Sequence, residues 1–185
     1  MKSETLTDFD TDQVLENHGV FTIFGPIDNQ VGEAAVRFVL AHNLAKNKSK
    51  HISFVINSEG GDLNSAFAII DVIRFSKVPV HTLGLGQISS SGLMIFMAGA
   101  KGHRGLTPNT SIMSHQWSGT FEGKIHELLS AQEDFEQTTN RMIEHYQTCS
   151  GLDEQFIRSR LLPPHDVYLT AEQAVNMGIA DRIQR

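Results

Sequence analysis

The chain has 185 residues, of which 40% are hydrophobic and 19% charged, and its net charge is −6. This length predicts one domain, and the composition is that of a globular protein with its own core. The acidic balance, without any run of more than two basic residues, argues against nucleic-acid binding through phosphate contacts. The single cysteine, Cys149, excludes an internal disulfide framework and a cysteine-based zinc site.

The sequence also gives no sign of a membrane segment, a secretory signal or a cofactor. No apolar run approaches the ~20 residues that a membrane helix needs, and the polar, acidic first residues lack the basic and apolar regions of a signal peptide. No Gly-x-Gly-x-x-Gly, Walker lysine or His-Glu-x-x-His pattern is present. We therefore expect a cytoplasmic protein with no cofactor, no metal and no membrane partner.

Hydrophobic periodicity predicts alternating strands and helices after an N-terminal arm without clear periodicity, residues 1–17. The predicted elements are a strand at Val20–Phe24, a helix at Gln30–Lys46, a buried strand at Ile52–Ile56, a helix at Leu63–Phe75, a strand at Val78–Gly84, a small-residue loop at Gly86–Gly92 and an apolar stretch at Leu93–Ala98. This alternation indicates βαβ units in an α/β fold with a largely parallel sheet.

Two features stand out in the second half of the chain. The segment Glu122–Gln147 has no proline and carries helical spacing of apolar residues, which predicts a helix about 38 Å long. This helix lies on the surface, breaks into two kinked helices, or forms an arm that packs against another subunit. Further on, Thr170–Gln173 has the sequence of a capping box, and Gly178 is a plausible terminator of the helix that follows.

A serine-rich loop is the first candidate for chemistry. The segment Gly84–Gly92 follows a strand and opens a helix, so a serine there presents its hydroxyl at a helix N-terminus. Free N–H groups and the helix dipole at that point favour a developing oxyanion. Serines are also common N-caps, and local sequence alone favours that structural role.

Three further positions have both a structural and a chemical interpretation. The pair Gly60-Gly61 follows a strand, where it forms a plain tight turn or a loop that aims backbone donors into a site. His115 ends a short apolar run and is placed to act as a general base. Asp166 lies in a loop that enters the last predicted strand, where a carboxylate either shapes the turn or orients a histidine.

Taken in order, these segments resemble the proteolytic subunit of the Clp protease family. The resemblance covers about residues 18–183, and its motifs are Ile56–Gly61, Gly86–Gly92, Ala98–Arg104, Pro108-Asn109, Ile112–Gln116, the long helix, and Asp166–Ala174 with Gly178. It implies an α/β fold of stacked ββα units, shared with the crotonases, and a long protruding handle helix. Residues 1–17 would form the N-terminal arm and residues 18–185 the peptidase domain.

The resemblance also implies the residues of a serine endopeptidase. Ser90 matches the family's nucleophile, His115 its general base and Asp166 the acid that orients the base. The backbone N–H groups of Gly61 and Ser91 match its oxyanion hole.

For the substrate, the resemblance implies an extended peptide added as a strand between Gly61–Leu63 and Gln116–Ser118, with Gly60, Leu63, Gln116 and Trp117 as binding residues. Such backbone pairing tolerates many sequences. The family usually has proline where Glu59 and Trp117 stand, so we expect Trp117 to reshape the pocket for the residue before the scissile bond.

The family assembles as two stacked seven-membered rings that enclose a chamber, and the long helix matches the element that joins the rings. A ring ATPase of the AAA+ class feeds unfolded proteins and peptides into this chamber. Two other interpretations stay open. One is a catalytically silent ring subunit, although such subunits typically lose residues of the triad. The other is a crotonase-type enzyme acting on acyl-CoA thioesters, although these enzymes are typically longer and often use glutamates.

Overall fold

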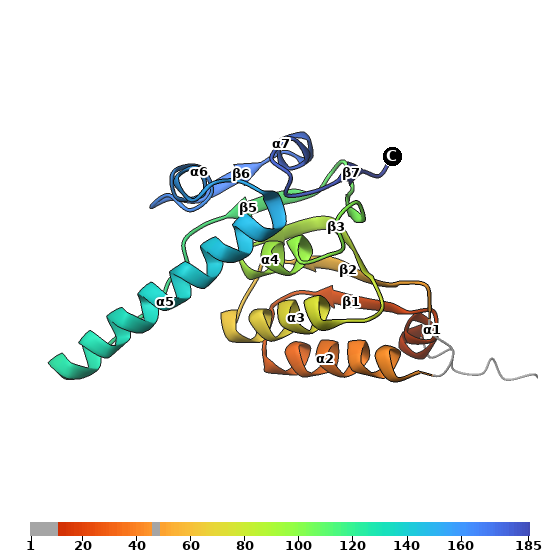
Figure 1. Ribbon diagram of the computed structural model, residues 1–185, viewed down its shortest axis with the longest axis horizontal. Helices are drawn as coiled ribbons and strands as arrows, with labels where there is room; N and C mark the ends of the chain where they lie inside the picture. Colours follow the sequence, from red (N-terminus) through yellow and green to blue (C-terminus); the bar gives the residue numbers. More distant parts are fainter. Residues whose placement is uncertain (1–10, 46–48) are drawn as a thin grey trace, which may run out of the picture.

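The computed structural model describes residues 11–45 and 49–185, and helices and strands alternate as expected between residues 20 and 97 (Figure 1). The strands are β1 Val20–Phe24, β2 Ile52–Ser58, β3 Val80–Ser89, β4 Arg104–Leu106, β5 Ser111–Ser114, β6 Val167–Leu169 and β7 Arg182–Ile183. The helices are α1 Thr11–Asn17, α2 Asn29–Leu44, α3 Leu63–Phe75, α4 Ser91–Met97, α5 Ile125–Ser150, α6 Glu154–Arg160 and α7 Ala171–Asn176. The helix α1 was not expected; the rest of the predicted arm, residues 1–10, lies outside the described residues.

The strands of the described residues form one mixed sheet, in which the order β1-β2-β3-β4-β7 is parallel throughout. The strand β5 pairs in parallel with the second half of β3, and β6 runs antiparallel to β5. The prediction of a largely parallel α/β sheet is therefore confirmed. Asp166 was expected in a loop that enters the last strand. It directly precedes β6, which is the last strand but one, because β7 follows.

The strand β3 is longer than predicted, because it continues to Ser89 through the segment that was expected to be a loop. Its first half pairs with β4 and its second half with β5. Between the halves, Gly86 has φ +63° and the pairing with β2 shifts register. A side chain at Gly86 would meet the Asn57 amide at 2.7 Å. Glycine at position 86 therefore lets one strand continue through the first part of the segment that was predicted to be a loop.

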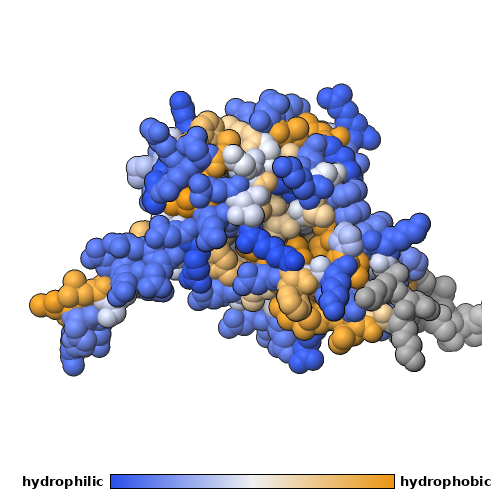
Figure 2. Space-filling model, in the orientation of Figure 1, coloured by the Kyte–Doolittle hydropathy of each residue, from blue (hydrophilic) through white to orange (hydrophobic). Residues whose placement is uncertain are grey.

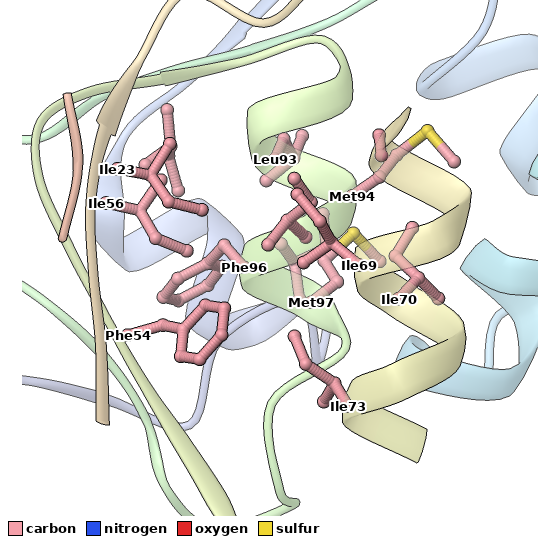
Figure 3. Close-up of a cluster of buried hydrophobic side chains, with 14 of the residues drawn as sticks. Ile23, Phe54, Ile56, Ile69, Ile70, Ile73, Leu93, Met94, Phe96 and Met97 are labelled. Carbon is pink, nitrogen blue, oxygen red and sulfur yellow. The ribbon is translucent and has the colours of Figure 1, made fainter. Parts of the chain in front are cut away.

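The core lies between the sheet and the helices α3 and α4 (Figure 3). All residues of α4 are buried, which places this short helix inside the domain. Figure 3 shows the side chains of Leu93, Phe96 and Met97 from α4 among those of the sheet and of α3. Burying one such apolar side chain contributes about 1.5–3 kcal/mol. The first residue of α4, Ser91, is therefore held in place by a helix that is packed into the core.

The helix α5 is one uninterrupted helix of 26 residues, about 39 Å long. It begins and ends three residues later than predicted, and the alternative of two helices with a kink is not observed. Its buried residues all come from its second half, and its first half projects from the body (Figure 1). It ends at Gly151, whose φ of +80° is the left-handed conformation of many helix ends. None of the helices in the described part of the chain could cross a membrane.

Candidate active site

The site lies at one edge of the sheet, at the carboxyl ends of three parallel strands. Gly60-Gly61 follows β2, Ser90 follows β3 and His115 follows β5. Because β2, β3 and β5 run parallel as neighbours, these ends meet at the same edge. The Nε2 atom of His115 lies 2.7 Å from the Ser90 hydroxyl oxygen, which is hydrogen-bond distance.

Asp166 reaches the same edge through the antiparallel strand β6. In the register of β5 and β6, Ser114 lies opposite Val167, so the residues just beyond this pair, His115 and Asp166, are neighbours. The carboxylate of Asp166 lies 3.7 Å from Nδ1 of His115, and its side chain is 52% exposed. The structure thus brings all three predicted residues together, with a looser contact on the Asp166 side.

The backbone of Ser90 is strained. Its φ is +53°, and it is the sole non-glycine residue with positive φ in residues 11–45 and 49–185. Its N–H donates to the Met113 carbonyl at 2.9 Å. Ser90 occupies the N-cap position of α4, but its side chain makes no capping hydrogen bond. The hydroxyl faces His115 instead, so the capping role that local sequence favoured is not what the structure has.

The geometry also distinguishes Ser90 from the serines beside it. Ser89 is fully buried, and its hydroxyl accepts a hydrogen bond from the Gln87 side chain at 3.0 Å. Ser91 is 1% exposed, and its hydroxyl donates to the Gly61 carbonyl at 3.3 Å. Within the described chain, only the middle hydroxyl of the three pairs with a histidine.

The glycine pair packs directly on the serine turn. Gly60 has φ +102°, and a Cβ there would lie 2.7 Å from the Cβ of Ser90 and 3.1 Å from the Ser91 nitrogen. A Cβ on Gly61 would collide with the backbone of Ile27. The loop is fixed further by Ser58, whose hydroxyl accepts from the Gly60 N–H at 3.0 Å and donates to Gly25. Glycine is required at both positions, so this is more than a plain tight turn.

The backbone N–H groups of Gly61 and Ser91, two residues that line the same pocket as Ser90, are candidates for an oxyanion hole. Ser91 is the first residue of α4, and the first N–H groups of a helix have no partner within it. The Ile27 N–H donates to the Gly60 carbonyl, and the Asp62 N–H donates to the Ile27 carbonyl. The Gly61 N–H takes no part in this pairing. The Ser91–Gly61 hydrogen bond holds both segments together.

A pocket of about 290 Å³ opens beside Ser90 and His115. Its other lining residues are Gly61, Asp62, Leu63, Asn64, Ser91, Met94, Trp117, Ser118, Asp134, Thr138 and Met142. Leu63 and Trp117 were predicted as substrate-binding residues and both line it. The other two, Gly60 and Gln116, do not line it: Gly60 is buried, and the Gln116 side chain donates to the Leu162 carbonyl at 2.8 Å. The indole N–H of Trp117 is buried, with no hydrogen-bond partner in the described residues.

Sequence reasoning missed the contribution of α5 to this pocket. Asp134, Thr138 and Met142 follow one another at intervals of four, which places them on one face of the helix. That spacing is visible in the sequence. Nothing in the sequence indicated that this face of α5 lies beside the serine turn rather than in solvent.

A buried histidine links α5 to α4 behind the site. His145 is 2% exposed, its Nδ1 lies 2.8 Å from the Arg74 guanidinium and its Nε2 lies 2.8 Å from the Met94 carbonyl. Because arginine only donates, Nδ1 accepts and the ring proton is on Nε2. Burial, with the charge of Arg74, lowers the pKa of His145 to about 4. No cluster of potential metal ligands occurs in the described part of the chain.

The fold and the Ser–His pair define an α/β protein with a candidate hydrolase site. A family model described as Clp protease matches residues 2–185, which is nearly the whole chain. The chain therefore belongs to the Clp protease family, and the predicted resemblance is confirmed. Membership of this family supports a peptidase function for the chain.

Proposed function

We propose that the chain is a serine endopeptidase subunit with Ser90 as the nucleophile, His115 as the general base and Asp166 as the residue that orients His115. The observation that carries the proposal is the 2.7 Å contact between His115 Nε2 and the Ser90 hydroxyl, made by a serine in a strained backbone conformation. Strained residues of this kind gather at active sites, where the surrounding structure holds them in place.

The mechanism follows from the positions of these atoms. Nε2 of His115 takes the hydroxyl proton as the Ser90 oxygen attacks the peptide carbonyl carbon. The N–H groups of Gly61 and Ser91 stabilise the oxyanion, and Asp166 stabilises the imidazolium. His115 then gives its proton to the leaving amine, and an acyl-enzyme remains. Water, deprotonated by His115, attacks this ester and releases the carboxylic acid with Ser90 restored.

The substrate is an extended peptide that adds as a strand beside Gly61–Leu63 and Gln116–Ser118. In the described structure, residues 116–118 form no backbone–backbone hydrogen bond, so their backbone groups are available for this pairing. Main-chain pairing gives affinity that depends little on sequence, and the pocket beside Ser90 receives one side chain. This mode of binding suits the unfolded proteins and peptides that the family degrades.

We test the activity with fluorogenic peptides and measure kcat/KM for the wild type, Ser90→Ala and Ser159→Ala. Ser159 is an exposed serine of α6 and serves as the matched control. Hydrolysis that is lost in Ser90→Ala and kept in Ser159→Ala supports the proposal. Normal assembly without hydrolysis would favour the silent subunit, and binding of acyl-CoA without peptide cleavage would favour a crotonase-type enzyme.

Several copies assemble into stacked rings through α5, and a AAA+ ATPase of the Clp type feeds the enclosed chamber. The free end of α5 supports this part of the proposal, because it exposes large apolar side chains (Figure 2), namely Phe121, just before the helix, Ile125, Leu128 and Leu129. Ile125 is 80% exposed and Leu129 is 63% exposed. Exposed apolar patches of this kind mark sites of protein association.

Light scattering tests the assembly. The wild type is expected at a mass many times 20.5 kDa, and Leu129→Ser is expected to lower that mass. Gln132→Ser, on the same half of the helix, is the control and should leave the mass unchanged. A wild-type protein that stays monomeric at working concentration contradicts the ring assembly.

A further inference from the structure

The pocket beside Ser90 has an apolar end and a charged end. The α5 face that lines it runs from Met142, which is 5% exposed, through Thr138, also 5% exposed, to Asp134, which is exposed. Met94 and Trp117 add apolar walls. A long side chain that enters this pocket therefore meets thioethers and an indole along its length, and a carboxylate near water.

The charge of the pocket is negative. Two carboxylates line it, those of Asp62 and Asp134, and no lysine or arginine does. Asp62 caps α3, and its hydrogen bonds with Ser65, through that residue's side chain and backbone, lower the pKa of its carboxyl. Among the described residues, the side chain of Asp134 has no ion pair and no hydrogen bond, so its carboxylate is available to a ligand.

The nearest arginine on α5 does not neutralise Asp134. Arg141 donates to the Thr138 hydroxyl at 2.8 Å and stacks over the ring of Phe67 with 4.7 Å to the centroid. These contacts engage its guanidinium with Thr138 and Phe67, and Arg141 does not line the pocket. Asp134 therefore lines the pocket without a cationic partner among the described residues.

We propose that Asp134 makes this pocket select lysine or arginine immediately before the scissile bond and reject aspartate and glutamate. The inference rests on the proposed peptidase function. Lysine and arginine bury their methylene stems on apolar surface while their charged ends stay in water. The stem packs on Met94, Met142 and Trp117, and the cation lies beside the carboxylate of Asp134.

The size of the preference follows from exposure. Asp134 faces water, and exposed ion pairs contribute little, so lysine should exceed a neutral side chain of the same length by about two- to fivefold in kcat/KM. Salt screens such a pair and should reduce the preference. Glutamate at the same position meets two like charges, so it should be the poorest substrate.

The test uses three peptides that differ only in the residue before the scissile bond: lysine, norleucine or glutamate. We compare the wild type with Asp134→Asn and with Glu133→Gln, an exposed α5 neighbour that does not line the pocket. The ratio of kcat/KM for lysine to that for norleucine should fall towards one in Asp134→Asn and stay unchanged in Glu133→Gln. The rate with norleucine should be the same in the wild type and in Glu133→Gln.

The peptides distinguish a failure of the inference about Asp134 from a failure of the proposed peptidase function. If the wild type cleaves lysine and norleucine peptides equally at low salt, or if Asp134→Asn keeps the wild-type ratio, the inference about Asp134 is wrong and the peptidase function stands. If the wild type cleaves none of the peptides, the peptidase function fails and the inference about Asp134 fails with it.

Discussion

The carboxylate of Asp166 and Nδ1 of His115 lie 3.7 Å apart, which is longer than a hydrogen bond, although the same ring lies 2.7 Å from Ser90. Catalytic hydrogen bonds are often long without substrate and tighten when substrate binds. Ser90 and His115 therefore form a close pair, and Asp166 is held more loosely beside His115.

This looseness predicts unequal effects of substitution. We expect Ser90→Ala and His115→Ala to lower kcat by about 10⁶-fold and Asp166→Asn by about 10⁴-fold or less. The reason is that, in the proposed mechanism, Asp166 acts through His115, and its side chain is half exposed, so water replaces part of its effect. Steady-state kinetics on peptides measures all three, and Glu172→Gln, an exposed acid of α7, is the control. An Asp166→Asn enzyme as inactive as Ser90→Ala would contradict the weak coupling.

The glycine loop gives a second prediction. Gly60→Ala should abolish peptidase activity, because the new Cβ would lie 2.7 Å from the Cβ of Ser90 and must displace the serine turn. Gly102→Ala is the matched control, since Gly102 also has positive φ, +88°, but a Cβ there meets nothing within 4 Å. Both variants carry the backbone strain, about 1 kcal/mol or more. If Gly102→Ala lost activity to the same extent, strain rather than the collision would be responsible.

An ion pair between the buried Arg104 and the partly exposed Asp181 ties β4 to the chain that leads into β7. Arg104 is 2% exposed and lies 2.6 Å from Asp181, and it also donates to the Cys149 carbonyl at the end of α5. We expect Arg104→Met to lower the free energy of unfolding by about 3 kcal/mol, because Asp181 loses the guanidinium and keeps only the backbone N–H donors of positions 102 and 104. Glu33→Gln, which breaks the exposed pair with Arg37, should cost less than about 1 kcal/mol. Urea unfolding measures both, and equal losses would contradict the argument from burial.

His145 predicts a loss of stability in acid. The pKa of His145 is lowered to about 4 in the folded protein, and an unfolded histidine has a pKa of about 6.5. At a pH well above about 6.5, His145 is neutral in both the folded and the unfolded protein, so its titration does not change the stability. As pH falls from about 6.5 towards 4, the unfolded state binds the proton first, and folding loses up to about 3 kcal/mol.

The variant His145→Gln isolates this contribution. Its amide keeps a donor for the Met94 carbonyl and an acceptor for Arg74, but it does not titrate. The free energy of unfolding, measured by urea at pH 7.5 and pH 5, should therefore fall less in the variant than in the wild type. His126→Gln, at an exposed position, should behave as the wild type does. His145→Gln with the full wild-type loss would show that other groups carry the acid sensitivity.

Much of the fold could be predicted because its signals are local. The bounds of α3 were predicted as observed, and the capping box at Thr170 forms, with its hydroxyl 3.1 Å from the Gln173 nitrogen. The extension of β3 could not be predicted, because its glycines are typical of loops. Only pairing with β2 and β5 makes the segment a strand.

The site was predictable in its residue types but not in its geometry. The proximity of His115 and Asp166 depends on the antiparallel register of β5 and β6, which are separated in sequence by two helices. The choice of Ser90 among adjacent serines depends on one positive φ. The place of Asp134 in the pocket lining depends on which face of α5 meets the core. These are tertiary relationships that no local pattern encodes.

The most direct test of the central claim is to react the protein with a fluorophosphonate and locate the label by peptide mass spectrometry. We predict a label on Ser90, because only an activated serine reacts, and the same label in Ser89→Ala. Ser90→Ala should take up none. A label on Ser89 or Ser91, or no label on an assembled wild-type protein, would contradict Ser90 as the nucleophile.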